Sequence, residues 1–235
     1  MENKTRKYFK YAVGEIILVV IGILIAIQLN DWNNYRQEKK VAKSYISALI
    51  SDIKKDTTEL NDFIRQAKEG TLELDNLLKT FSQHKVNTDS IKSIMKNDFN
   101  LFYFPLKDFN SQTISTLITT GDIKILPRHI QSALLKLKNT QKTSLDFIGK
   151  GIDFYNPILT EYSNKYPFYN PNNIKSQLAE QIWNNTDERD FLRTVYAVLS
   201  KKRTMYNTFL NNGNPTLDDS IKLLNLLSEE YPNIQ

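Results

Sequence analysis

The sequence contains no cysteine and only two histidines among its 235 residues. Without cysteine, disulfide bonds, thiolate nucleophiles and cysteine-ligated metal sites are excluded. His84 and His129 are far apart in the sequence. Neither has a second histidine or a carboxylate at the spacing that would place two ligands on one helix face. We therefore expect no metal and no other cofactor.

Glycine and proline are also scarce, with seven of each. A strand-rich fold uses both residues in its many turns, so their scarcity favours an all-α protein built from long helices. Gly149-Lys150-Gly151 is not a phosphate-binding loop, because it lacks both the earlier loop glycine and the hydroxyl residue after the lysine. No serine sits in a nucleophile elbow. We expect that the protein is not an enzyme.

Charge of one sign does not accumulate along the chain, although the formal net charge is +5. Residues 1–10 contain four bases against one acid, whereas the rest of the sequence interleaves acids with bases. Nucleic-acid-binding proteins concentrate their basic residues on one face, and no RNA- or DNA-binding motif is present. We therefore expect no nucleic-acid partner.

One long apolar run stands out at residues 11–29, "YAVGEIILVVIGILIAIQL", in which Glu15 is the only charged residue. As a helix, these 19 residues span about 28 Å, close to the hydrocarbon thickness of a bilayer. Basic and aromatic residues precede the run, and Trp32 and Tyr35 follow it, which is the pattern of a membrane span with interfacial belts. We predict a transmembrane helix over residues 11–30.

Two other structures share a basic start and an apolar run. A cleaved signal peptide needs small residues at its cleavage site, but the bulky Leu24 stands two positions before Ala26. A buried helix of a soluble protein is rarely aliphatic on all sides. An uncleaved signal anchor fits the run better than either.

The orientation of the span depends on the bases at its two ends. These bases are Lys4, Arg6, Lys7 and Lys10 before the run, and Arg36, Lys39, Lys40 and Lys43 after it. Their numbers nearly tie, but a first span with a short basic tail usually keeps that tail in the cytoplasm. We expect residues 1–10 in the cytoplasm, residues 11–30 in a bacterial inner membrane and residues 31–235 as a periplasmic helical domain.

After the span, apolar residues recur every three or four positions from Ile46 to Phe81, which predicts a long helix with a knobs-into-holes seam. The spacing also extends back through the span, so both parts are expected to form one rod, with a bend at "NDWNN", residues 30–34. Gly70 is expected to weaken this helix. The seam can pack against a second copy or inside the chain's own bundle, and the sequence leaves both open.

The remaining sequence predicts further helices of a mostly antiparallel bundle. They are expected over residues 90–98, 111–120, 128–165, 174–184, 187–210 and 217–231. Pro127 is expected to open the helix over residues 128–165, and Gly149, Gly151 and Pro157 are its expected kink points. The expected caps and helix ends are Thr88 or Asp89, Asn110, Gly121, Thr186 or Asp187, and a Thr216–Asp219 capping box.

The N-terminal pattern resembles the signature of a family of uncharacterised single-pass proteins from Bacteroidota, a domain of unknown function. The matching residues are Gly14, Glu15, Ile16, Gly22, Ile23, Leu24, Ile25, Ala26, Gln28, Asn30 and Trp32. A weaker likeness is "TLITTGDIKIL", residues 116–126, which is similar to a glycine-centred helix end of the same family. The resemblance implies a membrane location and a helical architecture, and it implies no reaction.

Gly14, Glu15, Gly22 and Ala26 are the candidate packing residues of the span. The spacing of Gly22 and Ala26 lets two helices approach closely in lipid. Glu15 lies one turn inside the predicted boundary, so it can reach the headgroups, or it can pair with a polar group on a partner's span. We expect three partners: the lipid bilayer, a second copy bound through the span and the seam, and another membrane protein.

Aromatic residues crowd two other stretches. They can line a ligand pocket or a partner groove, or they can form the bundle core. The candidates are Phe102, Tyr103, Phe104, Phe109, Tyr155, Tyr166, Phe168 and Tyr169.

Taken together, these features predict a membrane-anchored helical interaction or scaffold module. The alternative is a periplasmic ligand-sensing bundle that acts through a partner protein, because ten cytoplasmic residues cannot carry a signalling domain. Triplets that begin at Asp56, Asp89 and Asp219 resemble an acceptor pattern for O-glycosylation, although two of them also stand where a helix cap is expected.

Overall fold

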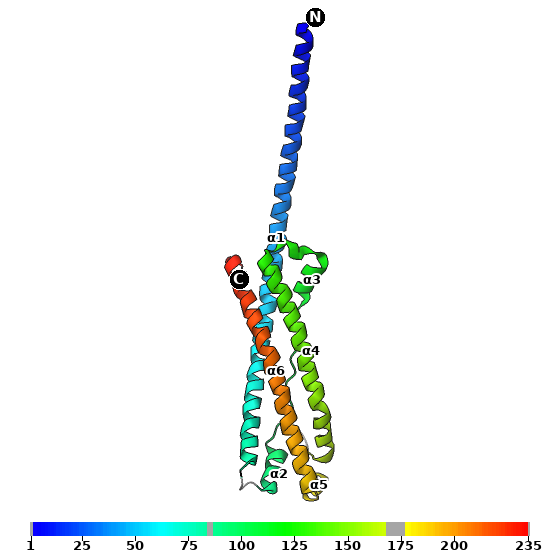
Figure 1. The fold of residues 1–235 in the computed structure, drawn as a ribbon, viewed down its shortest axis with the longest axis vertical. Helices are drawn as coiled ribbons and strands as arrows, with labels where there is room; N and C mark the ends of the chain where they lie inside the picture. Colours follow the sequence, from blue (N-terminus) through cyan, green and yellow to red (C-terminus); the bar gives the residue numbers. More distant parts are fainter. Residues whose placement is uncertain (1, 84–86, 168–176, 235) are drawn as a thin grey trace.

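The computed structural model describes residues 2–83, 87–167 and 177–234. All regular secondary structure in this described part is helical, as the composition predicts. Helix α1 (Glu2–Phe81) runs unbroken for 80 residues. The first half of α1, which we call the rod, projects from a helical bundle as a single helix. The second half of α1 is part of that bundle (Figure 1). The predicted continuity of span and heptad-patterned helix is therefore observed.

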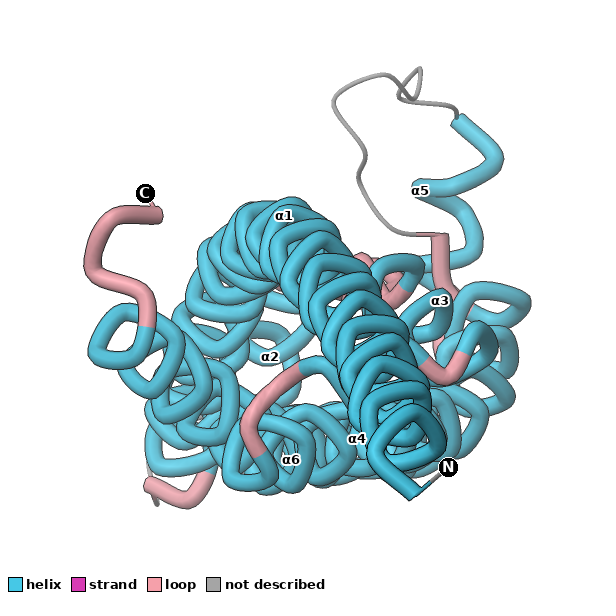
Figure 2. Tube along the Cα trace, turned by 90° about the horizontal axis from the view of Figure 1, so that it is seen from above, coloured by secondary structure: helices cyan, strands magenta, loops and turns pink. Residues whose placement is uncertain are grey.

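Three long helices form the frame of the bundle. Helix α4 (Arg128–Lys165) and helix α6 (Glu188–Glu230) lie side by side, and α6 also packs along α1. Seen from the end, α1 is inclined over the bundle (Figure 2). The apolar seam of α1 packs inside this one chain. Its buried members are Ile46, Leu49, Ile53, Leu60, Phe63, Ala67 and Leu74.

The fourth side of the bundle is not a long helix. After the short helix α2 (Thr88–Asn97), residues 98–111 run without helix back along the bundle to α3 (Gln112–Thr120) (Figure 1). A short 3₁₀ helix, η1 (Asp122–Ile125), then leads into α4. Helix α5 (Gln177–Asn184) lies at the periphery of the bundle (Figure 2).

The core consists of two apolar clusters with a polar layer between them. The cluster near the rod contains Ile46, Leu49, Ile53, Ile130, Leu134 and Leu223. The far cluster contains Leu60, Phe63, Ile148, Tyr155, Phe191 and Phe209. Along α1, α4 and α6, buried polar residues separate the two clusters. They are Asp56, Gln141, Ser144, Thr216 and Ser220.

The predicted break before the last helix is wrong, because α6 continues through Gly213 and Pro215. Gly213 is required by close packing: a Cβ there would lie 3.1 Å from Ile64 Cγ1 on α1. Thr216 does not cap a helix but donates its hydroxyl to the Asn212 carbonyl, at 3.0 Å. Asp219, the other residue of the predicted capping box, instead accepts a 2.6 Å hydrogen bond from Lys136 of α4.

The predicted bend, weak point and kink points lie inside continuous helices, as expected for α1 and α4. Helix α1 continues through residues 30–34 and through Gly70, and α4 continues through Gly149, Gly151 and Pro157. Gly70 makes room for a side chain, because a Cβ there would overlap the ring of Tyr206. At Gly70, packing against Tyr206 of α6 therefore outweighs the preference of glycine for turns.

The helix ends follow the sequence signals only in part. Gly121, with φ of 78°, ends α3 as predicted, and Asp187 caps α6 by accepting from the Asp190 amide. Helix α2 is capped by Asn87, not by Thr88 or Asp89. Asn110 does not cap α3, because it is bound to Asp56 of α1.

Candidate functional site

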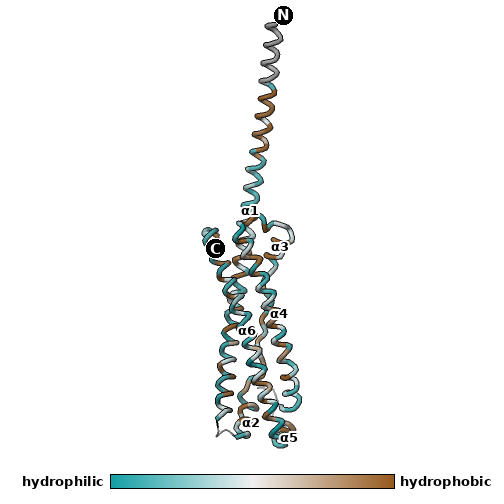
Figure 3. Tube along the Cα trace, in the orientation of Figure 1, coloured by the Kyte–Doolittle hydropathy of each residue, from teal (hydrophilic) through white to brown (hydrophobic). Residues whose placement is uncertain are grey.

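The rod is the most exposed apolar part of the described chain. Every residue from Gly14 to Val41 is exposed, and none of the most apolar 18-residue window, with mean hydropathy 1.9, is buried. Figure 3 shows this apolar stretch in brown on the free part of α1. By length and composition, α1 is long and apolar enough to cross a membrane. Such an area needs an apolar environment to cover it.

The four packing candidates of the span all lie on this free rod. Within the described residues, no atom beyond the adjacent backbone of α1 comes within 4 Å of a Cβ built on Gly14 or Gly22, and Glu15 and Ala26 are exposed. The fold therefore leaves these residues available to lipid or to another chain.

Helix geometry gives the direction in which these residues point. Leu49 is fully buried and marks the side of α1 that faces the bundle. Counting back from Leu49 at about 100° per residue, Gly22 lies about 180° round the helix axis from Leu49. Glu15 and Ala26 lie within roughly 40° of Gly22. These three residues share the side of α1 that is turned away from the bundle.

The aromatic candidates do not gather around one cavity. Tyr103 and Tyr155 pack edge to face with ring centroids 6.0 Å apart, and the Tyr155 hydroxyl donates to the Leu101 carbonyl at 2.7 Å. Tyr166 packs against Trp183 and Phe191, with centroids 5.8 and 5.3 Å away. These rings fill the far cluster, as the alternative interpretation of core packing expects.

The other aromatic candidates lie nearer the surface or outside the described residues. Phe109 is half-buried against the far cluster, and Phe102 and Phe104 are 50% and 63% exposed. Phe168 and Tyr169 lie outside the described residues.

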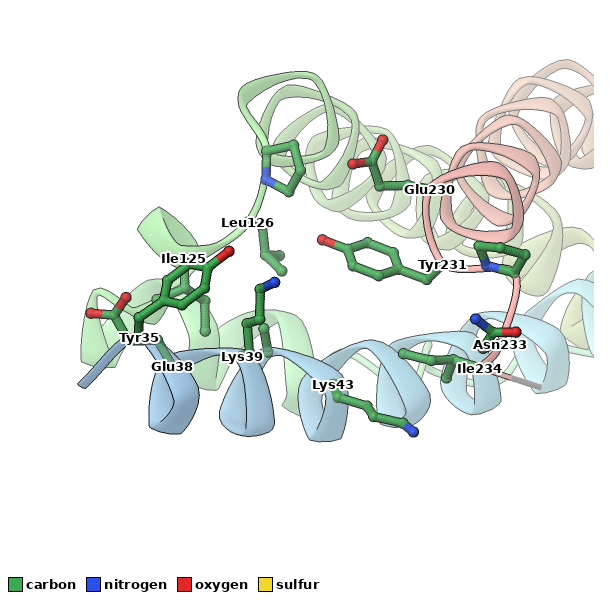
Figure 4. Close-up of a pocket in the computed structure, with 13 residues that line it drawn as sticks. Tyr35, Glu38, Lys39, Lys43, Ile125, Leu126, Glu230, Tyr231, Asn233 and Ile234 are labelled. Atoms are coloured by element: carbon green, nitrogen blue, oxygen red, sulfur yellow. The ribbon is translucent and has the colours of Figure 1, made fainter. Parts of the chain in front are cut away.

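A groove of about 740 Å³ opens where the rod leaves the bundle. Its walls come from α1, from the turn before α4 and from the end of α6, and Figure 4 shows the side chains of Lys39 and Tyr231 directed into the same space. Beside it, Lys39 Nζ lies 4.5 Å from the Tyr35 ring centroid, and Arg36 Cζ lies 4.9 Å from that of Trp32.

Sequence patterns did not identify the groove, because its walls come from three distant segments. The sequence signal nearest to the groove was the group of basic and aromatic residues at positions 32–39, which indicated the end of a membrane span. At the far end of the groove, Glu230 lies 3.6 Å from His129 Nε2. Burial and the neighbouring Glu230 raise the pKa of the Tyr231 hydroxyl, which therefore stays protonated as a hydrogen-bond donor.

Two buried charged side chains hold the extended residues 98–111 in place. Asp56 Oδ1 accepts hydrogen bonds from the Asn110 amide at 2.9 Å and from Asn110 Nδ2 at 2.7 Å. Gln141 Nε2 donates to Asp56 Oδ2 at 3.2 Å. Burial raises the pKa of Asp56, the Asn110 bonds oppose this, and Asp52 and Glu59 add to it.

Lys202 is the second buried charge. Its ammonium group donates to the Asn100 carbonyl and lies 4.9 and 5.5 Å from the ring centroids of Phe99 and Tyr206. Burial lowers its pKa to about 8, with a small opposing effect of Glu73. Both charges bind a segment that has no strand or helix partner for its backbone, so we assign them a structural role.

The likeness of the chain to known proteins is at the level of a family. Neither the curated proteins nor the solved structures contain a significant match. One family model matches residues 15–199, a range that includes most of the apolar run, all of α4 and the first part of α6. Its description is "Family of unknown function (DUF6090)". The chain belongs to this family.

Proposed function

We propose that the chain is a membrane-anchored interaction or scaffold module. In this proposal α1 crosses a bacterial inner membrane once, residues 1–10 stay in the cytoplasm and the bundle is held in the periplasm. The observation that carries the proposal is the unbroken α1, which joins an exposed apolar segment to the core of a helical bundle without a hinge. No catalytic reaction is assigned to the chain.

The rod gives the module a defined reach. Leu29 ends the apolar run and Ile46 is the first buried residue of the seam, 17 positions later. A helix of that length is about 25 Å long, so the buried core of the bundle would lie beyond the lipid headgroups. A scaffold built in this way presents its surfaces at a fixed height and a fixed rotation relative to the membrane.

Self-association through the rod is part of the proposal. The seam inside the bundle is already occupied by the chain's own helices, so it offers nothing to a second copy. Glu15, Gly22 and Ala26 instead face away from the bundle, where two rods can approach back to back without displacing either bundle. This geometry restricts the contact between copies to the free part of α1.

Crosslinking in native membranes followed by mass spectrometry tests this contact. Gly22→Ile should remove the crosslinked dimer, because a large side chain keeps the two helices apart. Val20→Leu is a matched control, since Val20 lies on the opposite side of the rod at about 100° per residue. A wild-type chain recovered only as monomer, with no partner attached, would overturn the assembly role.

The orientation is tested by a reporter fused after Gln235. Activity of a reporter that works only outside the cytoplasm is the expected result. Activity of a reporter that works only in the cytoplasm would reverse the assigned sides.

Ligand sensing through a partner protein is the second candidate. The groove beside Lys39 favours it, because its volume of about 740 Å³ is typical of a small-molecule site. The aromatic residues that suggested a pocket within the bundle give no support, since Tyr103, Tyr155 and Tyr166 pack within the core cluster or against it.

A further inference from the structure

Two cations on the rod are held on the side nearer the apolar run. Arg36 is stacked over Trp32, and Lys39 is stacked over Tyr35, in each case one helical turn back along α1. Helical side chains lean toward the N-terminus of their helix, which here is the direction of the predicted span. Both charges therefore sit closer to the membrane than their own backbone.

The height of these charges matches the headgroup layer. Trp32 and Tyr35 follow Leu29 by three and six residues, so they lie about 5 and 9 Å beyond the end of the apolar run. The headgroup region is roughly 5–8 Å thick on each side of a bilayer. The two cations are thus placed near the level of lipid phosphates.

The groove begins at the same level. Tyr35 and Lys39 line its membrane-facing end, and apolar side chains of Ile125 and Leu126 form part of its wall. The Tyr231 side chain points across the space toward Lys39 (Figure 4). A phosphate oxygen can accept hydrogen bonds from the Lys39 ammonium group and from a tyrosine hydroxyl. Hydrogen bonds to a charged group are strengthened where apolar walls reduce its contact with water.

The local charge favours an anionic ligand. Residues 31–43 contain four bases and two acids. The acids are Asp31, which lies about 80° round the helix from Lys39, and Glu38, which lines the groove together with Tyr35 and Lys39. Glu230, at the other end of the groove, faces His129. On the part of α1 that borders the groove, Arg36, Lys39 and Lys43 outnumber Glu38, so a headgroup with a net negative charge is attracted most strongly at this end.

We propose that the membrane-facing end of this groove binds the phosphate of an anionic phospholipid through Lys39, with the Tyr231 hydroxyl as a further donor and with Arg36, which lies beside the groove, as a second cation. Such a site requires the membrane crossing proposed above. It would fix the rotation of the rod relative to the bilayer and would make the position of the bundle sensitive to lipid composition.

Lipid retention by the full chain tests this site. The chain is placed in bilayers of phosphatidylglycerol and phosphatidylcholine, extracted gently, and the lipids that remain bound are counted by native mass spectrometry. Each base near an anionic surface contributes roughly fivefold to binding, so R36Q/K39Q should lower phosphatidylglycerol enrichment by about tenfold or more. Tyr231→Phe should lower it by a smaller factor.

A matched control removes the same charge elsewhere on α1. K54Q/K55Q changes two exposed lysines beside the bundle and should retain phosphatidylglycerol as the wild type does. Equal retention of both lipids by the wild type would overturn the site, as would wild-type enrichment in R36Q/K39Q. An unchanged Tyr231→Phe would remove that hydroxyl from the site and so overturn the proposal as stated.

Vesicle flotation separates this site from the anchor. All variants should float with vesicles of either lipid, because the apolar run is intact in each of them. Flotation without phosphatidylglycerol enrichment would overturn the lipid site alone. A wild-type chain that does not float would overturn both the site and the proposed membrane crossing.

Discussion

Lys202 shows how one residue links burial to pH. Its pKa falls from 10.5 to about 8 because the ammonium group is buried. Between these two values the unfolded chain binds more protons than the folded one, so the free energy of unfolding should rise with pH, by about 3 kcal/mol. Urea unfolding in detergent, followed by circular dichroism at several pH values, measures this rise.

Lys202→Met should abolish that rise, because methionine has a similar shape and no charge. Lys201→Met is the control, since Lys201 is only half-buried and lies over the Phe154 ring at 4.2 Å. A control chain that loses the pH dependence while Lys202→Met keeps it would contradict the assignment.

Asp56 gives a second prediction at this scale, because it is a buried acid whose pKa is raised, whereas Lys202 is a buried base whose pKa is lowered. Because burial raises its pKa, the folded state is destabilised as pH rises through that pKa and the carboxyl ionises. Asp56→Asn should remove this dependence and be tolerated at neutral pH. Its amide can donate to Gln141 Oε1, a buried atom with no hydrogen-bond partner, while its oxygen still accepts from Asn110.

Asp56→Ala separates the hydrogen bonds from the charge. It leaves both Asn110 donors without their acceptor and should lower the free energy of unfolding by about 1–3 kcal/mol. Equal unfolding free energies for Asp56→Asn and Asp56→Ala at neutral pH would show that the Asn110 contacts do not stabilise the bundle.

At the scale of elements, close helix packing explains where glycine occurs. Gly213 lets α6 approach Ile64 of α1. Gly213→Leu should force the two helices apart and lower the free energy of unfolding by about 1–3 kcal/mol. The same denaturation measurement checks it, with Asn211→Leu on the exposed side of α6 as the control. A Gly213→Leu chain as stable as the control would contradict the packing argument.

Local signals predicted the elements unevenly. The heptad spacing correctly predicted the long helix to Phe81, because the buried residues of α1 follow one stripe. The turn signals near Gly213 and Pro215 misplaced a helix end, because contacts with α1 and α4 hold α6 straight through them. The sequence did not predict that residues 98–111 form the fourth side of the bundle. The residues that bind this extended segment lie on three other helices.

At the scale of the whole molecule, the rod and the bundle are energetically separate. Between Gly14 and Val41, where the structure describes the side chains, no residue belongs to either apolar cluster or packs against one. Residues 42–235 should therefore fold into a soluble bundle without the anchor. Circular dichroism and size-exclusion chromatography of that fragment check this, with helical signal and a monomeric elution volume expected. Aggregation or a loss of cooperative unfolding would show that the bundle needs the rod.

The sequence by itself determined that this protein is helical and that it carries one candidate membrane span. Both features depend on local composition: a continuous apolar run and a regular spacing of apolar residues along one helix. Only the tertiary structure decided which surfaces remain free. It packs the seam of α1, together with Tyr155 and Tyr166, into the chain's own core. It also assembles a groove from segments around residues 39, 126 and 231. These outcomes depend on contacts between distant parts of the chain, which no local pattern encodes.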